Sequence, residues 1–174
     1  KYMSEQEYMA IEYGYVDAKY GRRRHFEYAK KIGDFFDSIT PMSPIAIEKM
    51  DKINFFVKTG KSKLSGVSAT IKDHATGNIV LMLNEEDLVR LTESLGMSYS
   101  MDKYGKDGVK QKGGWAYIRS LLKADLNNAK NHPIQGLAGH ITNMGMLATQ
   151  RMFKQHGLDA WVCLQVHDEI SCYA

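Results

Sequence analysis

The sequence has few cysteines and no long apolar stretch. Its two cysteines, Cys163 and Cys172, are too few for a disulfide scaffold, and their spacing does not suit a zinc site. The longest apolar runs, such as residues 79–83, have five residues, whereas a membrane-spanning helix needs about 20. The first residues contain no apolar core of the kind that marks a signal peptide. We therefore expect no membrane partner and a reducing, cytoplasmic setting.

The charge is moderate in amount but uneven in distribution. A charged share of 25% and an apolar share of 44% exclude a disordered or fibrous chain. The 174 residues suit one domain, or one domain that carries an insertion. Lysine and arginine gather in residues 19–31 and 101–130, whereas residues 157–174 contain acids and neither lysine nor arginine. A site that binds polyanions with one part and metal cations with another would have this distribution. On charge alone, three solvated surface patches are the simpler explanation.

Caps and turns divide the first two-thirds of the chain into predicted elements. Ser4 has the spacing of a capping box with Glu7, Gly14 follows a helical pattern, and Asn84 is a helix N-cap. Alternating apolar residues around a turn indicate hairpins. Helices are expected over residues 4–13, 44–59 and 85–95, hairpins over 15–26 and 64–83, and an exposed loop over 98–114.

Two successive helices are predicted after this loop. The first carries an apolar stripe from Trp115 and, beside it, a polar stripe formed by Arg119, Lys123, Asn127 and Lys130. We expect it to end at Pro133, because proline disfavours helical geometry at the residue before it. The second runs from about Gln135 to Gly157. Its inward residues are expected to be Leu137, Ile141, Met144, Ala148 and Met152.

The last predicted element is an antiparallel hairpin with a polar turn. Residues 161–166 and 169–173 alternate around His167 and Asp168, a register that places Cys163 opposite Cys172. The neighbouring carboxylates of Asp168 and Glu169 repel each other, and a cation would relieve that repulsion. A turn between buried strands holds such carboxylates rigidly, as a metal-dependent phosphoryl-transfer site requires.

Two other interpretations of the turn stay open. Ordinary hairpin tips often carry an acidic residue. A His-Asp pair can also bind a transition metal in hydrolases, with His132, His140 and His156 as further candidates. We rank this alternative lower, because His140 and His156 lie 16 residues apart on one predicted helix and cannot converge on one ion.

Three segments resemble the DNA polymerase I family, also called family A polymerases, and they follow the family's order. Residues 14–24, Gly-Tyr-Val-Asp-Ala-Lys-Tyr-Gly-Arg-Arg-Arg, are similar to the segment after the fingers. Residues 131–136, Asn-His-Pro-Ile-Gln-Gly, are similar to the family's Asn-x-Pro-Ile-Gln-Gly. Residues 165–170, Gln-Val-His-Asp-Glu-Ile, resemble palm motif C. The chain departs from the family at Asn127, where an arginine is usual, and after Gly136, where the usual acid is missing.

The resemblance implies an α+β fold, in which an antiparallel palm hairpin packs with helices and an inserted α+β lobe is added. Residues 1–26 would form the end of the fingers–palm connection with a basic hairpin. Residues 27–112 would be an inserted subdomain without an assigned role, and residues 113–174 the palm segment. Motif A and the nucleotide-binding fingers helix are not in this sequence. We therefore expect a piece of a longer DNA-directed DNA polymerase, inactive alone.

The resemblance also implies roles for individual residues. Asp168 would be a principal catalytic metal ligand and Glu169 an accessory one, with two Mg²⁺ ions in the complete enzyme. Residues implied to bind primer and template are His167, Gln135, Asn131, Arg22, Arg23, Arg24, Arg119, Lys123 and Lys130. The expected partners are primer–template DNA, deoxynucleoside triphosphates and the remainder of the polymerase chain, in the cytoplasm, or in a host's cytoplasm if a phage encodes the protein. The alternative is a non-catalytic nucleic-acid-binding module derived from a polymerase.

Overall fold

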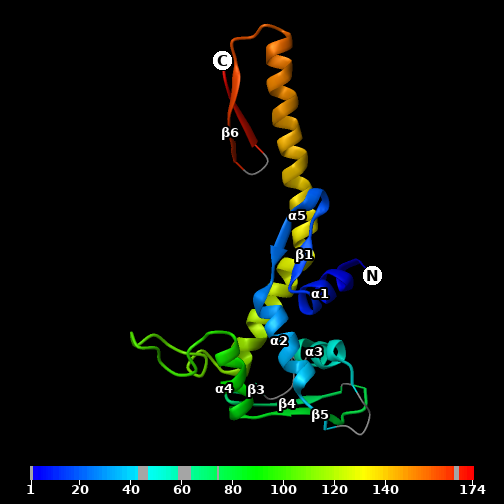
Figure 1. Ribbon diagram of the computed structural model, residues 1–174, viewed down its shortest axis with the longest axis vertical. Coiled ribbons are helices and arrows are strands. Elements are labelled where there is room, and N and C mark those ends of the chain that lie inside the picture. Colours follow the sequence, from blue (N-terminus) through cyan, green and yellow to red (C-terminus); the bar gives the residue numbers. More distant parts are fainter. Residues whose placement is uncertain (1, 43–46, 59–63, 74, 167–168) are drawn as a thin grey trace. The chain divides into compact units, whose positions relative to one another are not determined.

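The fold combines helices with small antiparallel sheets, which confirms the predicted α+β class (Figure 1). The computed structural model describes residues 2–42, 47–58, 64–73, 75–166 and 169–174. They divide into two compact units: Lys1–Val16 with Arg24–Lys130, and Asp17–Arg23 with Asn131–Ala174. Within the described residues, no helix has both the length and the apolar character needed to cross a membrane.

Four helices and the start of a fifth build the first unit. They are α1 (Tyr2–Glu12), α2 (Glu27–Ser38), α3 (Lys49–Lys58), α4 (Glu85–Ser94) and α5 (Trp115–Gln155). The predicted helices over 4–13 and 85–95 are confirmed, whereas the predicted start of α3 at residue 44 lies outside the described residues. At the start of α4 the Asn84 side chain accepts from the Asp87 N–H at 2.8 Å, and the Asp87 carboxylate accepts from the Asn84 N–H at 3.2 Å. This reciprocal pair is the capping box that begins the helix.

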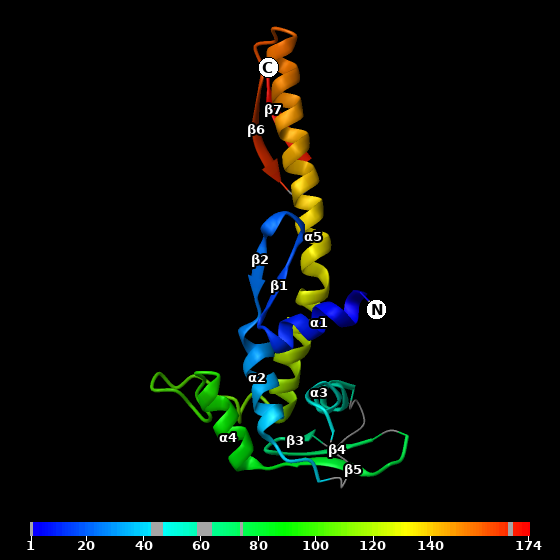
Figure 2. The same ribbon diagram turned by 45° about the vertical axis from the view of Figure 1, so that its right-hand side comes forward.

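A three-stranded antiparallel sheet completes the first unit. It is formed by β3 (Leu64–Ser65), β4 (Ser68–Lys72) and β5 (Ile79–Leu83), in that order. The turn between β4 and β5 is closed by the Asp73 carboxylate, which accepts from the Ala75 N–H and the Thr76 hydroxyl. The predicted hairpin over 64–83 is therefore confirmed. Helix α3 lies against β4, and α2 packs against α1, α3 and α4 (Figures 1 and 2).

One continuous core holds the first unit together. Phe36, Phe56 and Trp115 are fully buried at its centre; the Phe36 and Phe56 ring centroids lie 5.0 Å apart. The Trp115 indole N–H donates to the Val67 carbonyl at 3.0 Å. Side chains of α1, of the sheet and of α5 belong to the same core. The predicted division into residues 1–26, 27–112 and 113–174 rests on the resemblance to a polymerase family. It stays a prediction.

The prediction that a helix ends at Pro133 is wrong, and so is the predicted new start at Gln135. Helix α5 is continuous over 41 residues with Pro133 inside it. Proline removes one donor from the helical ladder and crowds the preceding turn, at a cost of about 3 kcal/mol. That cost is local, because it affects one hydrogen bond, and here the turns on both sides remain helical.

The predicted inward face of residues 137–152 is also wrong. Ile141, Met144 and Met152 are 62%, 55% and 56% exposed. The helix has other neighbours in the second unit: Gly145 approaches Ile170, and Gln150 accepts a hydrogen bond from the Val162 N–H at 2.9 Å. These contacts cover only one face of the helix. Because apolar residues occur on more than one face, those on the other faces stay exposed.

The predicted hairpin at the end of the sequence is confirmed, except for its register at one cysteine. Strands β6 (Trp161–Val166) and β7 (Glu169–Tyr173) pair antiparallel, with Val166 opposite Glu169 as expected. The register shifts between Val162 and Leu164, so Val162 lies opposite Cys172. The extra residue Cys163 therefore does not face Cys172, and both thiols are free and exposed.

Candidate functional site

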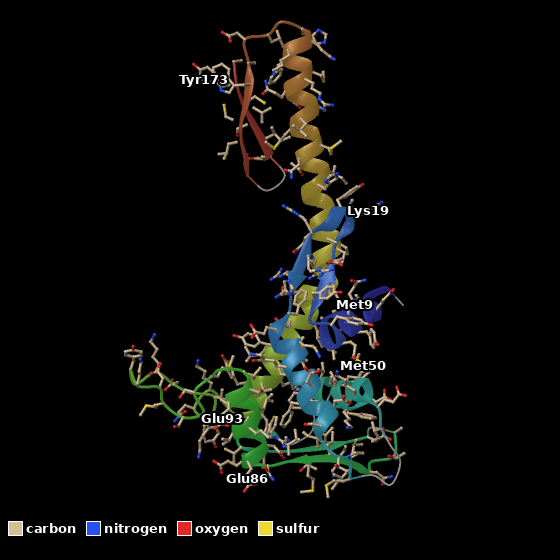
Figure 3. The ribbon with its side chains drawn as sticks, viewed as in Figure 1. Met9, Lys19, Met50, Glu86, Glu93 and Tyr173 are labelled. Atoms are coloured by element: carbon tan, nitrogen blue, oxygen red, sulfur yellow. The ribbon has the colours of Figure 1, made fainter. Side chains whose placement is uncertain are left out.

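Glu169 is the described member of the predicted metal site. It is the first residue of β7 and is exposed; Tyr173, at the opposite end of the same strand, is labelled in Figure 3. His167 and Asp168 lie outside the described residues. Among the residues that the structure describes, no group of three His, Cys, Asp or Glu side chains could hold a metal ion. The metal and catalytic roles of Asp168 and Glu169 stay predictions.

Two of the three segments that resemble the polymerase family contact each other in the second unit. The first segment forms a short hairpin of β1 (Tyr15–Asp17) and β2 (Arg23–His25), with the 3₁₀ turn η1 (Lys19–Gly21) between them. The second segment, residues 131–136, is part of α5. The hairpin is the one predicted around Gly21, and Lys19 marks its turn in Figure 3.

Small residues allow this contact to be close. A Cβ placed on Gly136 would lie 2.7 Å from the Ala18 Cβ, and one on Gly139 would lie 3.3 Å from an Arg22 guanidinium nitrogen. Glycine is therefore needed at position 136 for the hairpin turn to reach the helix.

Ring and backbone contacts strengthen the same junction. The Tyr20 and His140 rings stack with centroids 3.8 Å apart. The His132 Nε2 lies 3.3 Å from the Arg22 carbonyl oxygen. Tyr20 has a φ of 70°, in the left-handed region that residues other than glycine rarely adopt. His132 and His140, two candidate ligands of the transition-metal alternative, thus make contacts within the protein.

Asn131 and Gln135 lie four positions apart on α5, and both are exposed. Residues with this spacing share one helix face. The buried members of the segment are Pro133 and Gly136. The segment therefore presents its two amide side chains outward and its proline and glycine inward.

The three arginines of the basic hairpin have different environments. The Arg23 guanidinium makes a bidentate ion pair with Asp17, with Nε and Nη2 at 2.7 and 2.9 Å from the two carboxylate oxygens. The Arg24 guanidinium lies over the Phe26 ring, 5.5 Å from its centroid, and belongs to the first unit. Arg22 is exposed and makes no ion pair with any described acidic residue. Unlike Arg23, Arg22 therefore has no described acid that would compete with a phosphate.

The polar stripe on α5 contains two residues that stabilise the fold. Arg119 donates through Nε and Nη2 to the Val57 carbonyl, at 3.1 and 2.9 Å, where the last turn of α3 leaves carbonyls unpaired. Lys130 pairs with Glu7 of α1 at 3.0 Å. Lys123 is exposed. Of the three predicted DNA contacts on this stripe, Lys123 is the one whose charged group makes no such contact with another described residue.

Asp125 is a structurally important acid that sequence reasoning missed. Helix α2 has no side-chain cap of its own, and the Asp125 carboxylate of α5 accepts from the Ala29 N–H at 3.0 Å. Burial raises the pKa of the Asp125 carboxyl, while the hydrogen bond from Ala29 and the nearby Arg24 charge oppose that rise. The partners lie 96 residues apart in the sequence, so no local pattern indicates the contact.

The predicted site residues are divided between the two units. The first unit holds Arg24, Arg119, Lys123 and Lys130, and the second holds Arg22, Arg23, Asn131, Gln135 and Glu169. The structure brings the Arg22 segment together with the segment of Asn131 and Gln135, within the second unit. A single nucleic-acid surface that includes all these residues stays a prediction.

Comparison with known proteins finds a local similarity to a DNA polymerase. A stretch of 51 residues is 43% identical to DNA polymerase I of Pseudomonas aeruginosa. The match covers 29% of this chain and 6% of that polymerase, so the chain corresponds to a small part of the relative's length. No protein-family model matches the chain, and no solved structure matches it. The similarity is consistent with a piece of a DNA polymerase.

Proposed function

We propose that the chain is part of a template-directed DNA polymerase of family A, which adds nucleotides to the 3′ end of a primer by two-metal chemistry. The observation that carries the proposal is the local identity to DNA polymerase I. The contact between residues 17–23 and α5 supports it, because both segments belong to the motifs that resemble that family. The activity requires the remainder of the polymerase chain.

The donor set of the β6–β7 turn fits a magnesium site. Mg²⁺ binds carboxylate oxygens, and β7 begins with the exposed Glu169 next to Asp168 in the sequence. Metal ions in such a site activate the primer hydroxyl and stabilise the leaving pyrophosphate. In this proposal Asp168 supplies one principal carboxylate, Glu169 assists it, and a second principal carboxylate comes from the remainder of the polymerase.

The proposed DNA-binding residues fall into two groups, one that contacts phosphates and one that contacts the minor groove. Arg22 and Lys123, whose charges are not paired with described acids, contact phosphates and so position the duplex. Asn131 and Gln135 face outward from one side of α5 and, together with His167, donate to the minor groove near the primer end. Minor-groove acceptors occur at every base pair, so donors there test pair shape without selecting a sequence.

The test is primer extension with magnesium by the complete polymerase that contains this chain. Asp168→Asn removes a metal ligand and should abolish extension, while leaving binding of primer–template nearly unchanged. Asp159→Asn is the matched control, since it removes an exposed acid of the same unit that has no proposed role. Extension by Asp168→Asn at the parent's rate would overturn the catalytic assignment. If the complete, unsubstituted protein binds DNA but never extends a primer, the non-catalytic binding module is favoured.

A further inference from the structure

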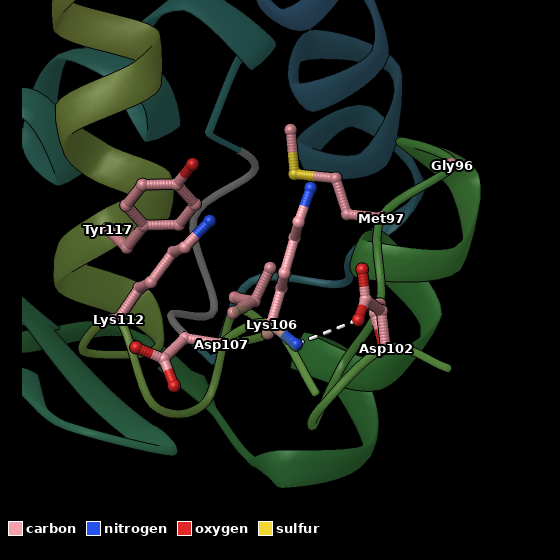
Figure 4. Close-up of a pocket in the computed structure, with 10 residues that line it drawn as sticks. Gly96, Met97, Asp102, Lys106, Asp107, Lys112 and Tyr117 are labelled. Atoms are coloured by element: carbon pink, nitrogen blue, oxygen red, sulfur yellow. Dashed lines mark hydrogen bonds between the residues drawn. The ribbon is translucent and has the colours of Figure 1, made fainter. Parts of the chain in front are cut away.

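The first unit contains a cavity that no proposed polymerase role uses. It lies where the loop after α4 returns to the start of α5, and its volume is about 440 Å³. Figure 4 shows its polar wall, which includes Asp102, Lys106, Asp107, Lys112 and Tyr117. The volume falls within the range of about 300–1,000 Å³ that is common for small-ligand sites.

The loop that forms the cavity is held in shape by its own hydrogen bonds. The Val109 N–H donates to the Ser98 carbonyl at 2.9 Å, and the Lys110 N–H donates to the Tyr99 carbonyl at 2.8 Å. Val109 is 2% exposed, so the loop is anchored in the core. A Cβ on Gly108 would overlap the Ser100 carbonyl oxygen, and glycine is therefore required there. The cavity is thus preformed.

Two lysines of the cavity wall can bind an anion. The Asp102 carboxylate is engaged within the loop, where it accepts from the Tyr104 and Lys106 N–H groups at 2.8 Å each. The Lys106 and Lys112 side chains make no ion pair with a described acidic residue, in contrast to Lys110, which pairs with Glu85 at 2.9 Å. The cavity wall thus carries two ammonium groups without ion pairs to described acids, together with the carboxylates of Asp102 and Asp107.

Lysine ammonium groups lie over aromatic rings along the same segment. The Lys112 ammonium lies 5.3 Å from the centroid of the Tyr117 ring at the cavity wall. Two further pairs follow this pattern: Lys110 over Tyr99 at 5.5 Å, and Lys103 over Tyr104 at 4.8 Å. The Tyr104 side chain is 72% exposed. Rings that accept stacked bases, next to ammonium groups that accept phosphates, are the chemistry by which proteins bind single-stranded nucleic acid.

We propose that residues 96–117 bind single-stranded DNA, with a base against Tyr117 and the adjacent phosphate between Lys106 and Lys112. Duplex DNA fits less well, because its bases are stacked inside the helix and offer no free face to a tyrosine. The proposal goes beyond nucleotide addition, and it rests on the proposed function only for the choice of DNA. RNA strands carry the same phosphates and base faces, so they are compared directly in the test.

The test measures binding of a labelled short oligodeoxythymidine to the 174-residue chain by fluorescence anisotropy, without metal or nucleotide. Lys106→Gln with Lys112→Gln should weaken binding and make the log–log salt slope shallower by about 0.7, the contribution of the one phosphate that the two lysines share on a single strand. The matched control is Lys58→Gln with Lys72→Gln, which removes the same charge from exposed positions of the same unit and should change little.

Tyr117 supplies an independent readout. Tyr117→Leu should weaken binding between about 5-fold and about 150-fold, the usual range for loss of one stacked base. Tyr117→Phe keeps the ring and should bind like the parent. Circular dichroism tests whether each variant is folded. If Tyr117→Leu unfolds, the double variant of Lys106 and Lys112 still tests the proposal, because both lysines are exposed.

Besides a failure of the chain to bind single strands, three results would overturn the proposal. The control lysine pair could weaken binding as much as the cavity pair, duplex could bind more tightly than single strand, or oligouridine could bind more tightly than oligodeoxythymidine. Primer extension by the complete polymerase is measured separately. A polymerase that extends primers normally, while this chain fails to bind single strands, would overturn only the present proposal.

Discussion

Replacing Gly136 by alanine sets two effects of opposite sign against each other. Alanine is favoured over glycine inside a helix by about 1 kcal/mol. The added Cβ would, however, lie 2.7 Å from the Ala18 Cβ, well inside the distance of about 3.5–4.0 Å at which carbon atoms pack. Both Cβ atoms are fixed to the backbone, so residues 17–23 must move by about 1 Å. Overpacking of this kind costs about 2 kcal/mol, and we expect a net loss of about 1 kcal/mol.

A matched glycine on the same helix gives the control. A Cβ on Gly145 would meet its nearest neighbour, the Ile170 Cδ1, at 3.7 Å, an ordinary contact. Gly145→Ala should therefore stabilise the second unit by about 1 kcal/mol. Amide exchange of residues 17–23, measured beside urea unfolding, reports the local effect. Adding Ala18→Gly to Gly136→Ala removes the overlap and should restore protection. If Gly136→Ala stabilises as much as Gly145→Ala, the close contact with Ala18 is wrong.

Two further predictions concern the first unit. Asn84→Ala removes half of the capping box with Asp87 and should lower the free energy of unfolding in urea by about 1 kcal/mol; an unchanged urea midpoint would contradict the cap. Burial raises the pKa of the Asp125 carboxyl above its ordinary value of 3.8, so the folded chain holds this proton more tightly than the unfolded chain. The resulting stability is complete below the ordinary pKa and is lost as pH rises through the raised pKa. Asp125→Asn can still accept from Ala29 but does not titrate, so its Tm should fall less as pH rises. An equal fall of Tm in the unsubstituted chain and in the variant would refute the raised pKa of Asp125.

Single residues with a strong local preference predicted much of the fold correctly. Gly14 and Gly96 follow helix ends with φ of +75° and +67°, a geometry that glycine adopts without strain. Helix α2 was not predicted, although Ile32, Phe35 and Phe36 recur at helical spacing and lie on one buried face. The sequence contained that apolar period.

Other features depend on residues far apart in the chain, and no local pattern could indicate them. The charge of Arg119 is the same whether it meets a phosphate or the Val57 carbonyl, 62 residues away. The contact of Arg22 with His132 crosses 110 residues. The bulge at Cys163 shifts the register by one residue, which alternation of apolar and polar positions cannot locate in so short a strand.

The continuous core of the first unit has a consequence for synthesis on the ribosome. It joins Ala10 of α1 to Trp115 and Ala129 of α5. At about 5–20 residues per second, about 6–24 s pass between translation of residue 10 and translation of residue 129. During that interval Phe36 and Phe56 have emerged without the tryptophan that covers them. The nascent chain therefore exposes apolar side chains during that interval, a state in which proteins are prone to aggregate, until α5 has left the exit tunnel.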